Sequence, residues 1–219
     1  MLNILITGGE GFIGGHLVRK LKALEHRVTV VDDMSGTQSK DTKHTPIFAM
    51  RVQDYLTRCE EKFDIIFHLA ATPRMGFSFD QPRKVLDNNI TSTIAVADYA
   101  SKANSWVFWS NSSMTTAIND AKINPYVHSK SISKDILELY SEHFGLNYSI
   151  LSFHNVYGPE EKIEGEYTTC VAKMLDDYQK HNKITITGDG TQSRQFTHVY
   201  DVIDATILAM KDKNHGTDY

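Results

Sequence analysis

The fold of this chain is decided by the stretch Thr7-Gly8-Gly9-Glu10-Gly11-Phe12-Ile13-Gly14-Gly15. An apolar run at residues 3–7 leads into it with the composition of a buried parallel strand, and residues 16–24 follow with leucines on one helical face. A strand, a glycine turn and a helix in this order direct free backbone N–H groups and the positive end of the helix toward a phosphate. Glycine suits the turn because a Cβ would block the pyrophosphate or the packing of helix on strand. The stretch therefore predicts a dinucleotide-binding turn, with candidate cofactor contacts at Gly8, Gly11, Phe12, Ile13 and Gly14.

A second apolar run, residues 27–31, ends in the acidic residue Asp32. Asp32 lies about twenty residues beyond the glycines, where a carboxylate can accept hydrogen bonds from the ribose hydroxyls of an adenosine. A carboxylate at this point repels a 2′-phosphate, so the pattern favours NAD over NADP. The alternative is that Asp32 and Asp33 only begin a solvated turn.

Strands and helices alternate along the rest of the chain. We expect further strands at residues 47–50, 64–71, 106–110, 147–153 and 184–187, and helices at residues 55–61, 81–102, 124–144 and 166–180. This alternation predicts an α/β fold with a Rossmann-type doubly wound parallel sheet. The strand at residues 64–71 ends in small side chains, so Leu69, Ala70 and Ala71 are candidate contacts for a dinucleotide that lies close to it.

The helix expected at residues 124–144 has clear end signals. Asn124 is a good N-cap, Pro125 fits the first helical turn, and Gly145 ends the helix. Tyr126 and Lys130 are four residues apart in its first turns and so share one face. The alternative is a chance pairing of surface side chains, but the position of this helix after the strand at residues 106–110 favours a place beside the nicotinamide.

Composition excludes several classes of function. The chain has 219 residues, 41% of them hydrophobic, with a net charge of −4 and a pI of about 6.2, so we expect one core and neither a nucleic-acid nor a membrane partner. No apolar run approaches a membrane span, and the N-terminus lacks a basic leader. Two cysteines without paired spacing and ten histidines without ligand spacing predict no disulfide, no metal site and a cytoplasmic location.

Together these motifs resemble the extended short-chain dehydrogenase/reductase family, in particular its nucleotide-sugar epimerase and dehydratase branch. The resemblance spans nearly the whole chain in the family's order. It rests on residues 7–14, 31–32, 68–71, 88–91, 126–130, 155–159 and 188–196.

The resemblance implies an NAD-dependent enzyme that acts on a nucleotide-diphosphate sugar. In such enzymes the tyrosine, here Tyr126, is the acid/base on a sugar hydroxyl while NAD takes the hydride from the same carbon. A free phenol has a pKa of about 10, so the Lys130 ammonium has to lower it toward neutrality. Transient oxidation gives a 4-keto sugar, and epimerisation at C4 follows if that sugar turns over before the hydride returns.

The resemblance also implies further contacts and an assembly. The additional cofactor contacts are Val52, Asn89 and His154, and the substrate contacts are Thr72, Asn155 and Arg194. Arg194 matches an arginine that grips the substrate diphosphate, for which a guanidinium is suited by its bidentate geometry. The helices at residues 81–102 and 124–144 would pair with their copies in a four-helix homodimer interface.

One departure from the family pattern concerns the catalytic hydroxyl. Asn111 stands at the position where the family has a serine or threonine. We assign the serine role to Ser112, with Asn111 and Ser113 as the alternatives, since an amide can also donate a hydrogen bond.

Two further departures concern the adenine and the end of the chain. Arg51 replaces an aspartate that accepts the adenine amino group, so adenine recognition is expected to rest on the Val52 backbone and on Asp32. The family continues for several dozen residues beyond the last residue of this chain, so we expect a small, incomplete substrate lobe. We predict an NAD-binding domain at residues 1–155, a partial substrate-binding lobe at residues 156–198, and a helix at residues 199–219 that returns to the first domain.

The sequence leaves three hypotheses for function. The leading one is an NAD-dependent nucleotide-sugar epimerase. No Asp or Glu occurs between Ser110 and Ile118, where the 4,6-dehydratases carry an acid, so a dehydratase is disfavoured. The alternatives are a nucleotide-sugar reductase that releases its reduced cofactor, and a catalytically weak or inactive NAD-binding fragment of the same family.

Overall fold

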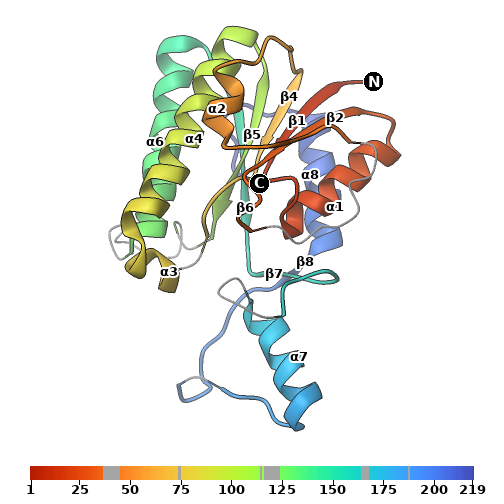
Figure 1. Ribbon diagram of the computed structural model, residues 1–219, viewed down its shortest axis with the longest axis vertical. Coiled ribbons are helices and arrows are strands. Elements are labelled where there is room, and N and C mark those ends of the chain that lie inside the picture. The colour runs from red at the N-terminus through yellow and green to blue at the C-terminus, as the bar shows by residue number, and fades with distance from the viewer. Residues whose placement is uncertain (37–44, 74, 114, 116–123, 164–167, 187) are drawn as a thin grey trace.

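Six parallel strands form the central sheet of the computed structural model, which describes residues 1–36, 45–73, 75–113, 115, 124–163, 168–186 and 188–219 (Figure 1). The strands are β1 (Asn3–Thr7), β2 (Arg27–Asp32), β3 (Ile47–Ala49), β4 (Ile65–His68), β5 (Trp106–Ser112) and β6 (Asn147–Phe153). They lie in the order β3-β2-β1-β4-β5-β6, and every neighbouring pair is parallel. Helices cover both faces, so the predicted Rossmann-type doubly wound sheet is confirmed.

Two helical layers enclose the sheet (Figure 1). One face is covered by α1 (Phe12–Ala23) and α8 (Val199–Asp212), and the other by α2 (Val52–Leu56), α4 (Pro82–Ala103) and α6 (Pro125–Phe144). Successive side chains of β1 alternate between these layers, with Ile4 and Ile6 packed toward α1 and α8 and Leu5 toward the opposite helices. All three are fully buried, as expected for a parallel strand covered on both faces.

The C-terminal residues extend the sheet beyond β6. The Ile150 N–H donates to the Thr217 carbonyl at 2.8 Å, and the Ser152 N–H donates to the Tyr219 carbonyl at 2.9 Å. Ile150 also forms a parallel bridge with Asp218. The segment after α8 therefore lies along the outer edge of β6.

A smaller part of the chain lies beyond the carboxyl ends of the strands. It contains α7 (Cys170–His181) and a parallel pair formed by β7 (Val156–Tyr157) and β8 (Thr197–His198). Figure 1 shows α7 projecting away from the sheet beyond this pair. The division of the chain into three units stays a prediction. In the part of the chain that the structure describes, no helix is long and apolar enough to cross a membrane.

Several predicted elements differ in the structure. Residues 184–186 form no strand: Ile184 and Ile186 are 52% and 61% exposed, and no described segment pairs with them. The helix predicted at residues 166–180 is α7, which begins at Cys170, and the helix predicted at residues 55–61 is α2, which ends at Leu56. Residues 166, 167 and 187 lie outside the described residues. The sequence patterns did not predict the short helix α3 (Met75–Asp80).

The predicted ends of α6 are confirmed. Asn124 has an extended backbone, and its side-chain oxygen accepts a hydrogen bond from the Val127 N–H at 2.8 Å. Pro125 occupies the first helical position, and Gly145 ends the helix with a φ of 69°. The Asn124 cap thus fixes the helical turn that carries Tyr126.

We expect Asn124→Ala to lower the free energy of unfolding by about 1 kcal/mol, because the buried cap is lost and the Val127 N–H is left without its acceptor. Urea denaturation monitored by circular dichroism measures the change. Asn124→Asp keeps the acceptor and serves as the control. Equal losses in the two variants would contradict a capping role.

Candidate active site

A cavity of about 710 Å³ lies at the carboxyl ends of the strands. It extends from the turn after β1 to the first residues of α7. The strand order reverses between β1 and β4, and the cavity lies at that reversal. Open α/β sheets bind their ligands at such a reversal, and the volume is typical of a small-molecule site. Among the predicted site residues, the lining includes Gly8, Gly11, Phe12, Ile13, Gly14, Asp32, Val52, Leu69, Ala70, Ala71, Ser112, Tyr126, Lys130, Asn155 and Arg194.

The glycine turn forms the middle of this cavity. A Cβ on Gly14 would lie 2.1 Å from the Gly8 carbonyl oxygen, so no larger residue fits where α1 crosses the turn. Gly11 is the N-cap of α1, and no side chain in the described part of the chain caps it. The N–H groups of the first helical turn, at Phe12 and Ile13, therefore have no partner within the helix and lie on the cavity wall. This is a site for an anion.

Asp32 lies at the end of β2 on the same wall. Its Oδ2 accepts a hydrogen bond from the Glu10 N–H at 3.0 Å, and its Oδ1 accepts one from the Met34 N–H at 2.8 Å. Burial raises the pKa of this carboxyl, and the two backbone hydrogen bonds oppose the rise. Each oxygen keeps a second lone pair, so the carboxylate can still accept from two hydroxyl groups.

Tyr126 and Lys130 lie on the opposite side of the glycine turn, where α6 faces β5. Tyr126 is half-buried and Lys130 is buried, and both line the cavity. The Lys130 ammonium donates to the Ser110 carbonyl at 2.7 Å and lies 4.9 Å from the centre of the Trp109 ring. The predicted pairing of a phenol and an ammonium on one helical face is thus present at the cavity.

Burial gives Lys130 unusual acid–base properties. Removal from water lowers the pKa of its ammonium to about 7. Burial and the Lys130 charge together lower the pKa of His68 to about 3, so this imidazole is neutral. His68 bridges Thr7 (Nδ1 to Oγ1, 2.7 Å) and Thr93 (Nε2 to Oγ1, 3.3 Å) beneath the cavity floor. Lys130 is therefore the buried cation on this side of the site.

Two candidates for the serine role reach the cavity. Both Asn111 and Ser112 line it, whereas Ser113 is not among the described lining residues. Asn111 is buried, and its Oδ1 has no hydrogen-bond partner in the described part of the protein. β5 continues to Ser112, two residues beyond its predicted end, and so carries both side chains to the cavity.

Three predicted contact residues are absent from the described lining: Thr72, Asn89 and His154. Asn89 is buried behind the wall, where its Oδ1 accepts from the Thr72 N–H at 2.7 Å and its Nδ2 donates to Ser129 Oγ at 2.9 Å. Its polar atoms are therefore used to join α4, α6 and the segment after β4. Instead of Asn89, its neighbour Asn88 lines the cavity and donates to Thr72 Oγ1 at 2.9 Å. Asn89 thus positions the wall and does not form it.

The far end of the cavity combines predicted and unpredicted residues. Asn155 donates from Nδ2 to the Gln195 carbonyl at 2.7 Å, which brings the segment after β6 next to the segment before β8. Arg194 lies on that second segment, exposed at the cavity wall. The sequence patterns missed Phe77 on α3 and residues 169–171 at the start of α7, which also line the cavity. No sequence motif marks these residues, because they reach the cavity wall only through the packing of α3 and α7.

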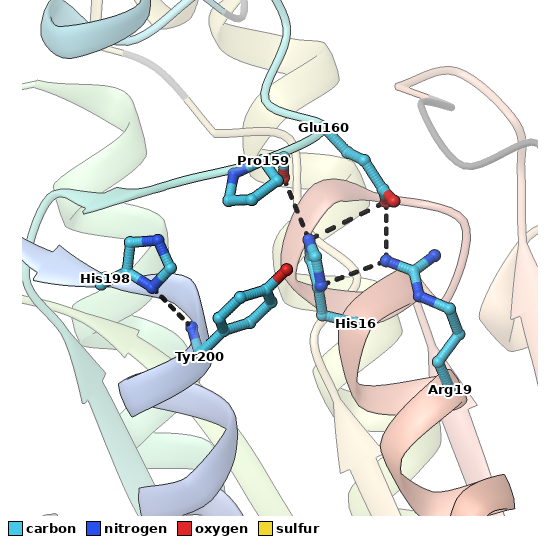
Figure 2. A network of polar contacts seen from close by, with 6 residues as sticks. All are labelled: His16, Arg19, Pro159, Glu160, His198 and Tyr200. Atoms are coloured by element: carbon cyan, nitrogen blue, oxygen red, sulfur yellow. Dashed lines mark hydrogen bonds and ion pairs between the residues drawn. The ribbon is translucent and has the colours of Figure 1, made fainter.

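A polar network joins the helix of the glycine turn to the segment after β7 (Figure 2). His16 Nε2 bonds to the Pro159 carbonyl at 3.0 Å, and Arg19 Nη2 donates to His16 Nδ1 at 3.1 Å and to Glu160 at 2.6 Å. Because a guanidinium only donates, Nδ1 is the acceptor and Nε2 carries the proton. The Tyr200 ring of α8 contacts the same imidazole edge-on, at 5.5 Å between ring centres. One buried ring thus holds the start of the second sheet against α1.

Comparison with known proteins identifies the family. The family model described as "NAD dependent epimerase/dehydratase family" matches residues 4–219. The chain belongs to this family. The resemblance inferred from the motifs is therefore confirmed, and NAD is the cofactor.

The relatives of this epimerase/dehydratase family member catalyse different reactions on nucleotide sugars. A UDP-N-acetyl-alpha-D-glucosaminuronate decarboxylase of Bacillus cytotoxicus is 29% identical over 97% of this chain and 72% of that protein. A putative UDP-glucose 4-epimerase of Methanocaldococcus jannaschii is 28% identical over 96% of this chain and 74% of that protein. Among solved structures, UDP-glucose 4-epimerase of Thermotoga maritima with UDP-glucose matches with a TM-score of 0.91 and 27% identity, over 100% of this chain and 76% of that one.

The geometry of the cavity fits NAD. The uncapped start of α1 provides N–H groups for the pyrophosphate, and the Gly14–Gly8 contact leaves no Cβ in the way. The Asp32 carboxylate provides acceptors for ribose hydroxyls. Among the described residues, no group of three or more His, Cys, Asp and Glu side chains is arranged to hold a metal ion. Backbone donors and one carboxylate therefore suit the pyrophosphate and the adenosine ribose.

The lowered pKa of Lys130 predicts a specific dependence of stability on pH. Between the folded value of about 7 and the reference value of 10.5, the unfolded chain binds more protons at this lysine than the folded chain does. Burial of the charged Lys130 therefore lowers the free energy of unfolding by its full amount below pH 7. This loss disappears as the pH rises toward 10.5. We expect the difference in free energy of unfolding between Lys130→Met and the wild type to shrink by a few kcal/mol from pH 7 to pH 9.5.

Urea denaturation of both proteins at each pH measures this difference, and the subtraction cancels the other titrating groups. Lys134→Met, which removes an exposed lysine one turn further along α6, serves as the control and should give a difference that is nearly constant with pH. A constant difference for Lys130→Met as well would contradict the lowered pKa.

Proposed function

We propose that this protein is an NAD-dependent nucleotide-sugar epimerase that inverts the sugar at C4 through a transient 4-keto sugar. One observation carries the proposal: Tyr126 and Lys130, on one face of α6, line the same cavity as the uncapped glycine turn and Asp32. A dinucleotide anchored by the turn and Asp32 would then bring its nicotinamide toward the phenol.

Tyr126 and Ser112 have different roles in the proposed reaction. The Tyr126 oxygen takes the proton of the sugar hydroxyl and later returns it, and the Ser112 hydroxyl donates a hydrogen bond to the reacting oxygen, a role that Asn111 could fill instead. When bound, NAD would supply reversible hydride transfer at the sugar carbon. The cavity would have to let the keto sugar turn while it is oxidised, so that reduction on the opposite face gives the epimer. No net oxidation occurs.

Lys130 makes the phenol a usable base. A positive charge close to a phenol favours the phenolate and lowers the pKa of the phenol. The same attraction favours the ammonium, so a phenolate at Tyr126 would raise the lowered pKa of Lys130 again. The hydrogen bond to the Ser110 carbonyl fixes the ammonium beneath the cavity while this exchange takes place.

The substrate is inferred to be a nucleotide-diphosphate sugar. Arg194 would bind the diphosphate through its guanidinium, and Asn155 would contact the sugar side, since both line the end of the cavity beyond Tyr126. Val52 and residues 69–71 line the cofactor side and would contact the dinucleotide there. Similar proteins include UDP-sugar epimerases and a UDP-sugar decarboxylase, which supports the substrate class without selecting one reaction.

The sequence near Ser112 favours epimerisation over elimination. Loss of water from the sugar needs an acid beside the catalytic hydroxyl, and residues 110–118 contain no Asp or Glu. The nucleotide-sugar reductase stays the alternative enzyme, and the inactive NAD-binding protein stays the alternative without catalysis.

Incubation of the protein with UDP-, GDP- and dTDP-sugars distinguishes these three hypotheses. New epimers without added cofactor support the proposal, a stoichiometric demand for NADH or NADPH supports the reductase, and NAD binding without turnover supports the inactive protein.

Replacement of the phenol tests the catalytic assignment. Tyr126→Phe removes the proton acceptor, and we expect turnover to fall about a hundred- to ten-thousandfold while the Kd for NAD changes less than about threefold. Tyr140→Phe changes a tyrosine of the same helix that is not among the described lining residues, and should keep full activity. Chromatography of the sugar products and calorimetry of NAD binding give the two readouts. Unchanged turnover in Tyr126→Phe would rule out this residue as the base.

The protein is also proposed to be a homodimer through α4 and α6. These helices pack against each other as an outer layer, and apolar side chains on them, such as Ile94 (40% exposed) and Leu139 (51% exposed), face outward. We expect light scattering to give twice the chain mass of 24.8 kDa and Leu139→Asp to give the monomer. Leu208→Asp makes the same change on α8, at a residue 64% exposed on the other layer, and should remain dimeric. A monomeric wild type would refute the proposal.

A further inference from the structure

The order of the strands fixes which end of the cavity receives the cofactor's base. Tyr126 and Lys130 lie on the side of β5, the glycine turn lies in the middle, and Asp32 ends β2. A dinucleotide with its nicotinamide near Tyr126 and its adenosine ribose on Asp32 therefore places its purine further out, beyond the end of β3. Arg51 lies there and lines the cavity.

Neighbouring side chains hold the Arg51 guanidinium in place. Its Nη2 donates to Asp87 Oδ2 of α4 at 2.8 Å. With the Gln53 amide turned so that its oxygen faces the guanidinium, that oxygen accepts from Nη2 at 2.5 Å and from Nε at 2.7 Å. None of these contacts uses Nη1, so its two N–H bonds point to no partner among these neighbouring residues. Arg51 thus offers unused donors at the purine end of the cavity.

Two carboxylates also line this end of the cavity. Both Asp32 oxygens accept backbone N–H groups, and Asp33 Oδ1 accepts from the Ser35 N–H at 3.0 Å and from the Ser35 hydroxyl at 2.5 Å. Arg51 follows the end of β3 and brings hydrogen-bond donors to the same end of the cavity. A guanidinium has five N–H groups and no acceptor.

This polarity matters at position 6 of the purine. Adenine carries an amino group there, which only donates, whereas a 6-oxo purine such as hypoxanthine carries a carbonyl oxygen, which accepts. Two donors facing each other form no hydrogen bond, and a guanidinium facing a carbonyl forms a charge-assisted one. A carboxylate at the same position would have the reverse preference.

We propose that Arg51 is a specificity-determining residue whose guanidinium donates hydrogen bonds to the edge of the purine. The site therefore accepts a dinucleotide with a 6-oxo purine in place of adenine. This inference concerns the cofactor's base alone and holds whichever reaction the protein catalyses.

A binding cycle with two dinucleotides tests the proposal. The probes are NAD and nicotinamide hypoxanthine dinucleotide, and the readout is the Kd of each for the purified protein by titration calorimetry. We expect the wild type to bind the two within about tenfold of each other. We expect Arg51→Ala to weaken the hypoxanthine form at least fivefold more than NAD. We expect Arg51→Asp to shift the ratio further toward NAD, because the carboxylate accepts from the amino group and repels the carbonyl.

The ratio of the two dissociation constants cancels general losses of stability or of cofactor binding. Arg58→Asp makes the same charge change at an exposed arginine that follows α2 and is not among the described lining residues, and its ratio should match the wild type. Equal weakening of both dinucleotides by Arg51→Ala would mean that the guanidinium only stacks on the base, and would overturn the proposal. An unchanged ratio in Arg51→Asp would overturn it as well.

Discussion

The close approach of α1 to the turn after β1 is the constraint on which the rest of the structure depends. A Cβ on Gly14 would lie 2.1 Å from the Gly8 carbonyl oxygen, and a Cβ on Gly9 would lie 2.6 Å from the Val30 side chain. The backbone contact at Gly14 leaves room only for a hydrogen atom, so α1 can begin at Phe12, shortly after β1 ends at Thr7. The first-turn N–H groups thereby point at the cavity, and Asp32 on the neighbouring strand lies within reach of the same ligand.

The side of the cavity that carries Tyr126 contains a buried lysine, Lys130. Lys130 is taken out of water, and its hydrogen bond to the Ser110 carbonyl and its position over the Trp109 ring offset only part of that cost. Burial lowers the pKa of the Lys130 ammonium accordingly. A neutral residue would pack there at less cost to the free energy of unfolding. The half-buried phenol of Tyr126 lies on the same helical face, and it is the group that we propose uses this charge.

The features that the sequence predicts well are those set by short-range chemistry. The glycine turn, the acid that ends β2 and the ends of α6 follow from residues within a few positions of one another, and the structure contains all three. The strand expected at residues 184–187 failed because a β-branched run forms a strand only where another strand pairs with it. The predicted contact of Asn89 with the cofactor stays a prediction. Its amide donates to Ser129, a contact that depends on how α4 and α6 pack and that the sequence pattern could not indicate.

The imidazole of His16 links two segments that border the cavity. It bonds to the backbone at Pro159 on one side and to Arg19, which also holds Glu160, on the other. The segment after β7 is thereby tied to α1, the helix whose first turn lies on the cavity wall. A change at this one ring would therefore disturb the small second sheet and the glycine turn together.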